Sequence, residues 1–228
     1  MRRRTNPWPA FVDLFSVLLT VTFAGFIMLS SAYEAELANV QKTEKEKKEF
    51  RERALAVKDK VKDALNKDAS LGASPRACGD DLCIDLYVLF ALNDDKITSD
   101  DEKVSLSRAC KYIKNALDTL PADEKKDLGL VVEGHTDSKQ ANFPDLRERE
   151  RFNWNLSARR ASSVLYEFRG CGLHAPDYQI VAIGYSDTLP VPDCKETPEK
   201  CDERNRRTTL RLHADTAQIE ERLNRSGR

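Results

Sequence analysis

The sequence lacks several patterns that would point to common functions. Its 228 residues carry a net charge of only −1 at pH 7 and contain no block of basic residues, so nothing in it indicates a nucleic-acid partner. Cys-x-x-Cys pairs, which are typical of zinc and thioredoxin-like sites, are missing. A glycine-rich phosphate loop and a Ser/His/Asp or Cys/His set at usable spacing are missing as well. We therefore expect a protein that performs no covalent catalysis and binds no metal or organic cofactor.

Long apolar runs are also scarce, and only one is long enough to cross a membrane. It extends from Ala10 to Leu29, and as a helix of about 20 residues it would span a bilayer. The arginines at residues 2–4 predict that the N-terminus stays in the cytoplasm. The rest of the chain would then lie in the periplasm of a bacterium, anchored in the inner membrane. The predicted organisation is a cytoplasmic stub at 1–9, a transmembrane helix at 10–33, a charged helical linker at 34–74, a globular domain at 75–214 and a polar tail at 215–228.

Asp13 is the one ionisable residue in this apolar run. A carboxylate near the bilayer centre costs roughly 2.5–3.5 kcal/mol, so its presence favours a functional role. It shares one side of the helix with small and hydroxyl-bearing residues, a composition that favours packing against other membrane helices. Two alternatives remain: a secretory signal peptide cleaved near Ser30-Ser31-Ala32, and a passive acid that reaches the membrane interface. The residues that share the side of Asp13 are Ser16, Val17, Thr20 and Ala24.

Residues 34–67 contain neither glycine nor proline and are rich in Glu, Lys, Ala and Arg. This composition predicts a solvated helix that ends at the Leu-Gly-Ala-Ser-Pro sequence of residues 71–75. Apolar residues at alternating spacings of four and three predict a seam that pairs with a second copy of the chain. The alternative is a single charged stalk. The seam consists of Phe50, Ala54, Val57, Val61 and Ala64.

Beyond residue 75, patterns of period two alternate with patterns of helical period. One helix is predicted at 104–120, and a second is predicted to begin at a cap on Asn155 or Ser157 and to end at Gly170. The order β-α-β-α-β-β predicts an α+β sandwich in which helices cover one sheet. The predicted strands lie at 82–90, 129–134, 178–185 and 206–213.

Six cysteines fit an oxidising compartment such as the periplasm. Six cysteines allow many pairings, and the sequence alone does not choose among them. Short spacing favours two local pairs and leaves two cysteines on helices, although some of the six could instead be buried thiols. The local pairs are Cys78 with Cys83 and Cys194 with Cys201, and the remaining residues are Cys110 and Cys171.

Four short motifs follow the predicted elements in order. Gly-His-Thr-Asp at 134–137 ends the second strand, and Gly-Tyr-Ser-Asp at 184–187 follows the third. Asn-Trp-Asn-Leu-Ser-Ala-Arg-Arg-Ala at 153–161 opens the second helix, and Asn-Arg-Arg at 205–207 begins the last strand. In this order the four motifs resemble those of the OmpA-like peptidoglycan-binding domain, over roughly residues 76–213.

This resemblance implies a ligand as well as a fold. Members of the family bind peptidoglycan stem peptides that end in diaminopimelate, which offers an ammonium group and carboxylates. Asp137 matches the acid that binds the ammonium, and Arg160 matches the arginine that binds a carboxylate. The alternative is an ordinary cap and a surface pair. The charged insertion at 138–152 departs from the short, glycine-containing loop of the family and would line or shield the groove. Asn153 and Leu156 match pocket-lining positions, Phe152 lies beside them, and Arg207 matches a family arginine with a ligand or structural role.

The whole layout also resembles a known class of membrane subunit. A basic stub, an acid-bearing membrane helix, a charged stalk and an OmpA-like domain are found in the B subunits of proton-driven stators of the MotB type. The segment at 7–19 most resembles the ZorB subunits of Zorya anti-phage defence. This implies a homodimer inside a pentamer of polytopic, ZorA-like A subunits, with protons as the coupling ion and Asp13 as the proton-binding group. The alternatives are a flagellar stator subunit and a non-motor peptidoglycan tether of the cell envelope.

Overall fold

The computed structural model describes residues 8–86, 90, 93–138, 145–191, 194–214 and 221. Four features predicted from the sequence fall wholly or partly outside these residues. They are the orientation signal at 2–4, the end of the first predicted strand at 87–89, residues 139–144 of the insertion, and the tail at 215–228 apart from Glu221. The chain divides into two compact units, Met1–Lys48 and Glu49–Arg228.

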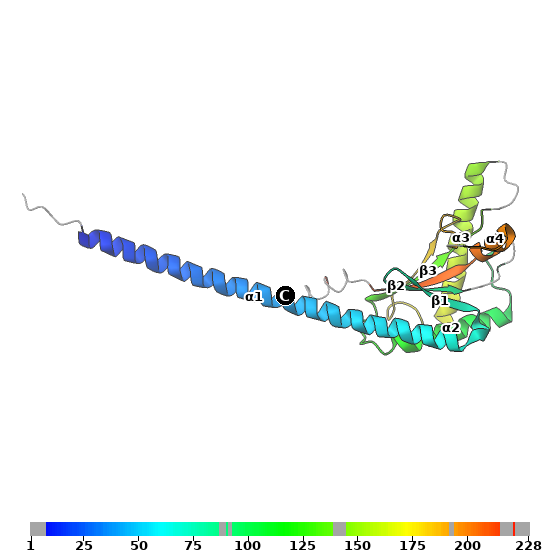
Figure 1. Cartoon of the computed structure of the whole chain (residues 1–228), viewed down its shortest axis with the longest axis horizontal. Coiled ribbons are helices and arrows are strands. Elements are labelled where there is room, and N and C mark those ends of the chain that lie inside the picture. Colours follow the sequence, from blue (N-terminus) through cyan, green and yellow to red (C-terminus); the bar gives the residue numbers. More distant parts are fainter. Residues whose placement is uncertain are drawn as a thin grey trace, which may run out of the picture. The chain divides into compact units, whose positions relative to one another are not determined.

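The first unit is formed by the N-terminal part of helix α1 (Trp8–Lys67, Figure 1). The helix predicted around Asp13 is present, and its large apolar side chains are exposed. Two hydroxyl groups bond within the helix: Ser16 Oγ donates to the Asp13 carbonyl at 2.9 Å and Thr20 Oγ1 to the Ser16 carbonyl at 2.7 Å. A hydroxyl paired in this way can enter an apolar environment at low cost. Within the described residues, α1 is the one helix long and apolar enough to cross a membrane.

The last turns of α1 belong to the second unit and form part of its core. Phe50, Val57 and Val61 are at most 1% exposed, and they join one apolar cluster with the sheet and the other helices. The predicted pairing of this seam with a second copy is therefore wrong, because the sheet domain of the same chain covers it. Leu65 is also buried and completes the seam in place of the half-buried Ala64.

The second unit contains a five-stranded sheet and starts at Glu49, so the domain boundary predicted at residue 75 falls inside it. The strand order is β1-β2-β5-β3-β4; β3 and β4 are parallel and the other neighbours are antiparallel. The chain thus has the predicted α+β architecture. The strands are β1 (Ala73–Cys78), β2 (Asp81–Leu86), β3 (Leu128–Gly134), β4 (Ile180–Gly184) and β5 (Thr208–Ala214). The helices after α1 are the 3-10 helix η1 (Ala69–Leu71), α2 (Asp100–Leu117), α3 (Leu146–Gly170) and α4 (Pro198–Asn205) (Figure 1).

One strand and one α-helix of the second unit were not predicted from the sequence. Strand β1 pairs only with β2 in the strand order and contains Pro75. Proline is tolerated at a sheet edge because its missing N–H is not needed there, but it weakens the strand pattern. Helix α4 has eight residues, too few to produce a clear helical period. The observed order therefore has one more strand and one more helix than β-α-β-α-β-β.

Helix α3 begins at Leu146, well before the predicted cap on Asn155 or Ser157. The carboxylate of Asp145 caps it, because its Oδ1 accepts from the Arg147 amide at 3.1 Å. The predicted start is wrong because the preceding Leu-Arg-Glu-Arg-Glu-Arg sequence consists of strong helix formers. The second part of the charged insertion is therefore the first part of α3.

The two faces of the sheet differ in polarity, since side chains alternate along each strand. On the face away from the core, the Asp85 carboxylate accepts from Arg76 Nε at 2.9 Å and from Thr209 Oγ1 at 2.7 Å. Burial alone would raise the pKa of Asp85, but these hydrogen bonds hold it below its ordinary value. Nearby, Arg211 Nε lies 2.8 Å from Glu133 Oε1. The core face carries aliphatic residues, including Ile84, Leu130, Val132, Leu210 and Leu212.

All six cysteines form disulfide bonds. Both predicted local pairs are confirmed; one links β1 to β2, and the other links α4 to the loop before it. The third bond links α2 to the residue that follows α3, so the alternative of buried thiols is wrong. The bonds are Cys78–Cys83, Cys194–Cys201 and Cys110–Cys171.

Candidate functional site

Two glycines at the ends of β3 and β4 let helix α3 pack directly on the sheet. A Cβ atom at Gly134 would overlap the backbone carbonyl of Ser157, and a Cβ atom at Gly184 would lie 2.5 Å from the backbone nitrogen of Ala158. A larger residue at either position would therefore push α3 away. This close contact brings the middle of α3 next to the loop that follows β3.

Hydrogen bonds hold that loop in place. The Thr136 amide donates to the Ser186 carbonyl at 2.8 Å, which ties the loop after β3 to the loop after β4. The Ser186 amide in turn donates to Ser157 Oγ of α3 at 3.0 Å. Because both loops and α3 are linked in this way, the position of the next residue, Asp137, is well defined.

The Asp137 carboxylate is buried against a guanidinium group. The residue is 3% exposed, and its Oδ2 atom accepts a hydrogen bond from Arg206 Nη1 at 2.6 Å. The Arg206 side chain is 31% exposed, so it lies on the solvent side of the carboxylate. A buried carboxylate without such a partner would carry a large desolvation cost.

Arg160 of α3 is fully buried in the same region. Its Nε donates to the Asp94 carbonyl at 3.0 Å, and its Cζ lies 5.1 Å from the centre of the Phe90 ring. Burial lowers the pKa of Arg160 to about 10, while the negative charge of Asp137 acts in the opposite direction. Arg160 therefore remains charged at neutral pH, and Asp137 is close enough to influence it.

Asp137 and Arg160 thus lie in the same region of the domain, and both are buried. Because both residues are buried, they do not form a pair on the protein surface. Asn153 and Leu156 lie on the same buried side of α3, at 2% and 0% exposure. Phe152 is half-buried beside them.

Two buried polar atoms near this pair have no hydrogen-bond partner among the described residues. They are the amide oxygen of Asn153 and the hydroxyl of Thr136, and both residues are 2% exposed. Buried polar atoms are almost always paired in folded proteins. Beside a charged pair, such atoms are suited to bind polar groups of a ligand.

Arg207, also predicted as a binding residue, lies in a different cluster. Its Nε is 3.5 Å from Asp85 Oδ1, and its Nη2 donates to the Leu189 carbonyl at 3.3 Å. These contacts place its guanidinium on the polar face of the sheet. Of the two roles that the resemblance allowed, the structure supports the structural one.

Arg206, which contacts Asp137, was not predicted from the sequence. It lies in the Asn-Arg-Arg motif at 205–207, and only its neighbour Arg207 was singled out. The alternation of side chains along a strand could have indicated its role, because consecutive side chains point to opposite faces of the sheet and only one of Arg206 and Arg207 can face Asp137. The contributions of Phe90, Asp94 and Asp95 were not predicted either. Phe90 and Asp94 contact Arg160, and Asp95 Oδ1 lies 3.4 Å from Arg159 Nε.

His135 precedes this site and faces the polar side of the sheet. It is 2% exposed, and its ring stacks on Tyr185 with centroids 5.7 Å apart. Burial, followed by the positive charge of Arg207, lowers the pKa of His135 to about 3. The imidazole is therefore neutral over the physiological range of pH.

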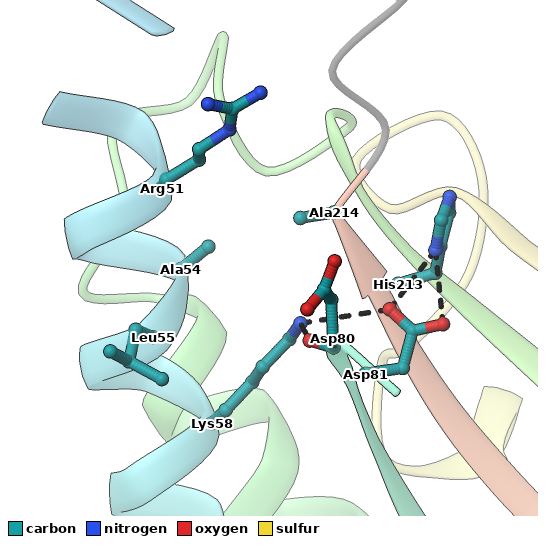
Figure 2. A pocket seen from close by; sticks show the side chains of 8 residues that line it. All are labelled: Arg51, Ala54, Leu55, Lys58, Asp80, Asp81, His213 and Ala214. Carbon is teal, nitrogen blue, oxygen red and sulfur yellow. Dashed lines mark hydrogen bonds and ion pairs between the residues drawn. The ribbon is translucent and has the colours of Figure 1, made fainter. Parts of the chain in front are cut away.

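A separate pocket of about 630 Å³ lies at the other end of β5 (Figure 2). Figure 2 shows Lys58 of α1 and His213 of β5 converging on the Asp81 carboxylate, at 3.7 Å and 3.0 Å. Lys58 also donates to the Asp80 carbonyl at 2.6 Å. Because Lys58 and Asp81 are partners of each other in these contacts, we interpret the cluster as a connection between α1 and the ends of β2 and β5. We assign no ligand to this pocket.

The chain was compared with known proteins at the level of sequence. No family model matches it. Over 98 residues it is 37% identical to the uncharacterized protein YtxE of Bacillus subtilis (strain 168), a match that covers 37% of this chain and 35% of that protein. The chain therefore spans about a third of the length of the curated relative it matches.

The fold of the sheet domain is similar to that of solved structures. A MotB-like protein from Desulfovibrio vulgaris superposes with a TM-score of 0.52 and 21% identity, over 74% of this chain and 95% of that one. The sheet domain has a MotB-like fold. The periplasmic domain of Helicobacter pylori MotB is also similar, with a TM-score of 0.47 and 20% identity over 68% of this chain and 89% of that one. The MotB-like fold agrees with the OmpA-like architecture expected from the four motifs.

Proposed function

We propose that the second unit binds peptidoglycan and anchors the protein to the cell wall. The observation that carries this proposal is the buried pair Asp137 and Arg160, located beside two buried polar atoms without described partners. Diaminopimelate in a stem peptide offers an ammonium group for the carboxylate and a carboxylate for the guanidinium. Charge-assisted hydrogen bonds of both kinds are stronger than neutral ones. The MotB-like fold supports the same assignment.

We further propose that the chain is the B subunit of a proton-driven stator in the bacterial inner membrane, with its N-terminus in the cytoplasm and the second unit in the periplasm. Two copies would sit inside a ring of about five polytopic A subunits. Asp13 would take up a proton from the periplasmic side and release it to the cytoplasm. Each proton supplies about 2.3 kcal/mol per 100 mV of membrane potential. The protein would perform no covalent catalysis.

The sequence at 7–19 supports Zorya anti-phage defence as the system in which this motor works, with a ZorA-like partner. A flagellar stator has the same parts and differs in its A subunit. Purification of the tagged chain from its host in mild detergent, followed by mass determination, distinguishes them. A long cytoplasmic extension on the partner is expected for defence, whereas a short partner encoded with motility proteins would contradict that assignment.

Sedimentation with purified sacculi tests the anchor. Asp137→Ala and Arg160→Ala should each lose most of the retention of the full chain, because the first removes the carboxylate proposed to bind the ligand ammonium and the second removes the guanidinium proposed to bind its carboxylate. Arg169→Ala is the matched control, since Arg169 is an exposed arginine near the end of the same helix. Retention of both site variants at the wild-type level would show that the wall-binding site lies elsewhere.

Asp13→Asn tests the motor. The amide keeps the size of the side chain but cannot carry a proton, so phage protection should be lost while the complex still assembles and binds sacculi. Glu34→Gln is the control, because Glu34 follows the apolar run. If Asp13→Asn protects as well as the wild type, the chain is a tether without ion flux.

A further inference from the structure

The carboxylate on which the proposed ligand depends already has a cationic partner. Arg206 Nη1 lies 2.6 Å from Asp137 Oδ2, and the carboxylate is almost fully buried. An ammonium group arriving from solvent therefore meets the Arg206 guanidinium before it meets Asp137. One of the two must move, and Arg206 is the more exposed member of the pair.

The backbone of Arg206 is held firmly, so any movement must come from its side chain. It directly follows α4, and its amide donates back into the last turn of that helix. The Asn205 amide oxygen accepts from the Val191 amide at 2.7 Å. The disulfide Cys194–Cys201 ties α4 to the loop before it. The guanidinium is thus the mobile end of an otherwise fixed residue.

The balance of charge favours exchange over simple addition. The guanidinium groups of Arg160 and Arg206 both lie close enough to interact with Asp137. Burial lowers the pKa of Arg160, the negative charge of Asp137 raises it, and the positive charge of Arg206 lowers it. A ligand ammonium placed beside both would be a third cation in a region of low dielectric, where like charges repel strongly. If Arg206 leaves as the ammonium arrives, the number of positive charges stays the same.

We propose that Arg206 is a resident counter-ion of the binding site, and that the ammonium group of the ligand must replace it on Asp137. This inference rests on the proposed peptidoglycan function and adds a selection step to it. A ligand without an ammonium group cannot replace the arginine and is rejected. A correct ligand binds more weakly than it would at an empty carboxylate, because it must first displace Arg206.

The test compares the wild-type full chain in detergent with Arg206→Gln and Arg206→Lys. Each is titrated calorimetrically with N-acetylmuramyl tripeptide that ends in meso-diaminopimelate. Arg206→Gln should bind about tenfold more tightly, equivalent to ~1.4 kcal/mol, because no cation has to be displaced. Arg206→Lys keeps a cation and should stay near the wild type. Equal or weaker binding by Arg206→Gln overturns the exchange.

A second probe isolates the ammonium group. The same muropeptide, acetylated on the free amine of diaminopimelate, should show no gain with Arg206→Gln. An undiminished gain with this probe would also overturn the exchange, since no ammonium could then have replaced the arginine.

A measurement on the wild type covers the case in which Arg206→Gln does not fold. In ¹⁵N-arginine-labelled protein, the Arg206 side-chain signal is identified by its absence from Arg206→Lys. It should shift when the muropeptide binds, and an unchanged signal at saturation contradicts the proposal. A wild-type chain that binds neither sacculi nor muropeptide refutes the peptidoglycan function and the exchange with it. Wild-type binding without a gain in Arg206→Gln refutes the exchange alone.

Discussion

His135 should make the second unit less stable in acid, because its pKa is lower in the folded protein than in the unfolded chain. The residue is 2% exposed, and burial is the main reason that its pKa falls to about 3 in the folded protein. In the unfolded chain a histidine titrates near its ordinary value of about 6.5. Between these two values the unfolded chain binds one more proton than the folded protein. Stability must therefore decrease as the pH falls from about 6.5 towards 3.

The slope contributed by one proton is at most about 1.4 kcal/mol per pH unit. Near pH 6.5 the unfolded histidine is only partly protonated, so the loss between pH 7 and pH 5 comes to about 2 kcal/mol. Above pH 7 His135 should contribute almost no pH dependence. The range stops at pH 5 because carboxylates with lowered pKa values, such as Asp85 and Asp118, add their own effects at lower pH.

This effect can be measured on a fragment that starts at Glu49. Its free energy of unfolding is obtained from urea unfolding, followed by circular dichroism, at pH 7, 6 and 5. His135→Gln removes the titrating group, so its free energy of unfolding should fall by about 2 kcal/mol less over this range than that of the wild type. His174→Gln is the control, because His174 is not buried, and it should retain the wild-type slope. If the wild type and His135→Gln show the same pH dependence, the buried neutral imidazole is not the cause.

Two further substitutions test packing. Gly134→Ala should lower the free energy of unfolding by about 1–3 kcal/mol or more and abolish retention on sacculi, because the new Cβ overlaps α3. Gly170→Ala is the control, because the space around its Cβ position is open, and it should have neither effect. Equal behaviour of the two variants would refute the packing argument. Phe50→Ala should destabilise the Glu49 fragment by about 3–5 kcal/mol at any protein concentration, whereas Leu55→Ala, on an exposed position of the same helix, should have little effect. A loss for Phe50→Ala that disappears at high protein concentration would instead indicate pairing between copies.

Most elements could be predicted because their sequence periods are produced by burial on one side. The strands β2, β3, β4 and β5 and the helix α2 were all expected close to their observed positions. Strand β1 was missed because an edge strand with Pro75 has little period. The start of α3 was misplaced because Asn155 and Ser157 are good capping residues in sequence, yet strong helix formers precede them.

The seam on α1 shows a different limit. The spacing of Phe50, Ala54, Val57 and Val61 predicts correctly that one side of this helix is buried. The same spacing is produced whether the helix packs on a second helix or on a sheet, since both contacts need only one apolar stripe. Which surface covers the stripe depended on the tertiary structure.

The sequence by itself determined the fold class, the membrane-length helix with its single acid, and the two residues at the centre of the candidate site, Asp137 and Arg160. The first two follow from the hydrophobic pattern of the sequence, and the site residues follow from its four short motifs. Only the tertiary structure decided the third disulfide bond, Cys110–Cys171, the partner of the α1 seam and the contacts of two adjacent arginines. Arg206 faces Asp137 and Arg207 faces Asp85, because consecutive residues entering a strand point to opposite sides, and what lies on each side is contributed by residues far away in the chain.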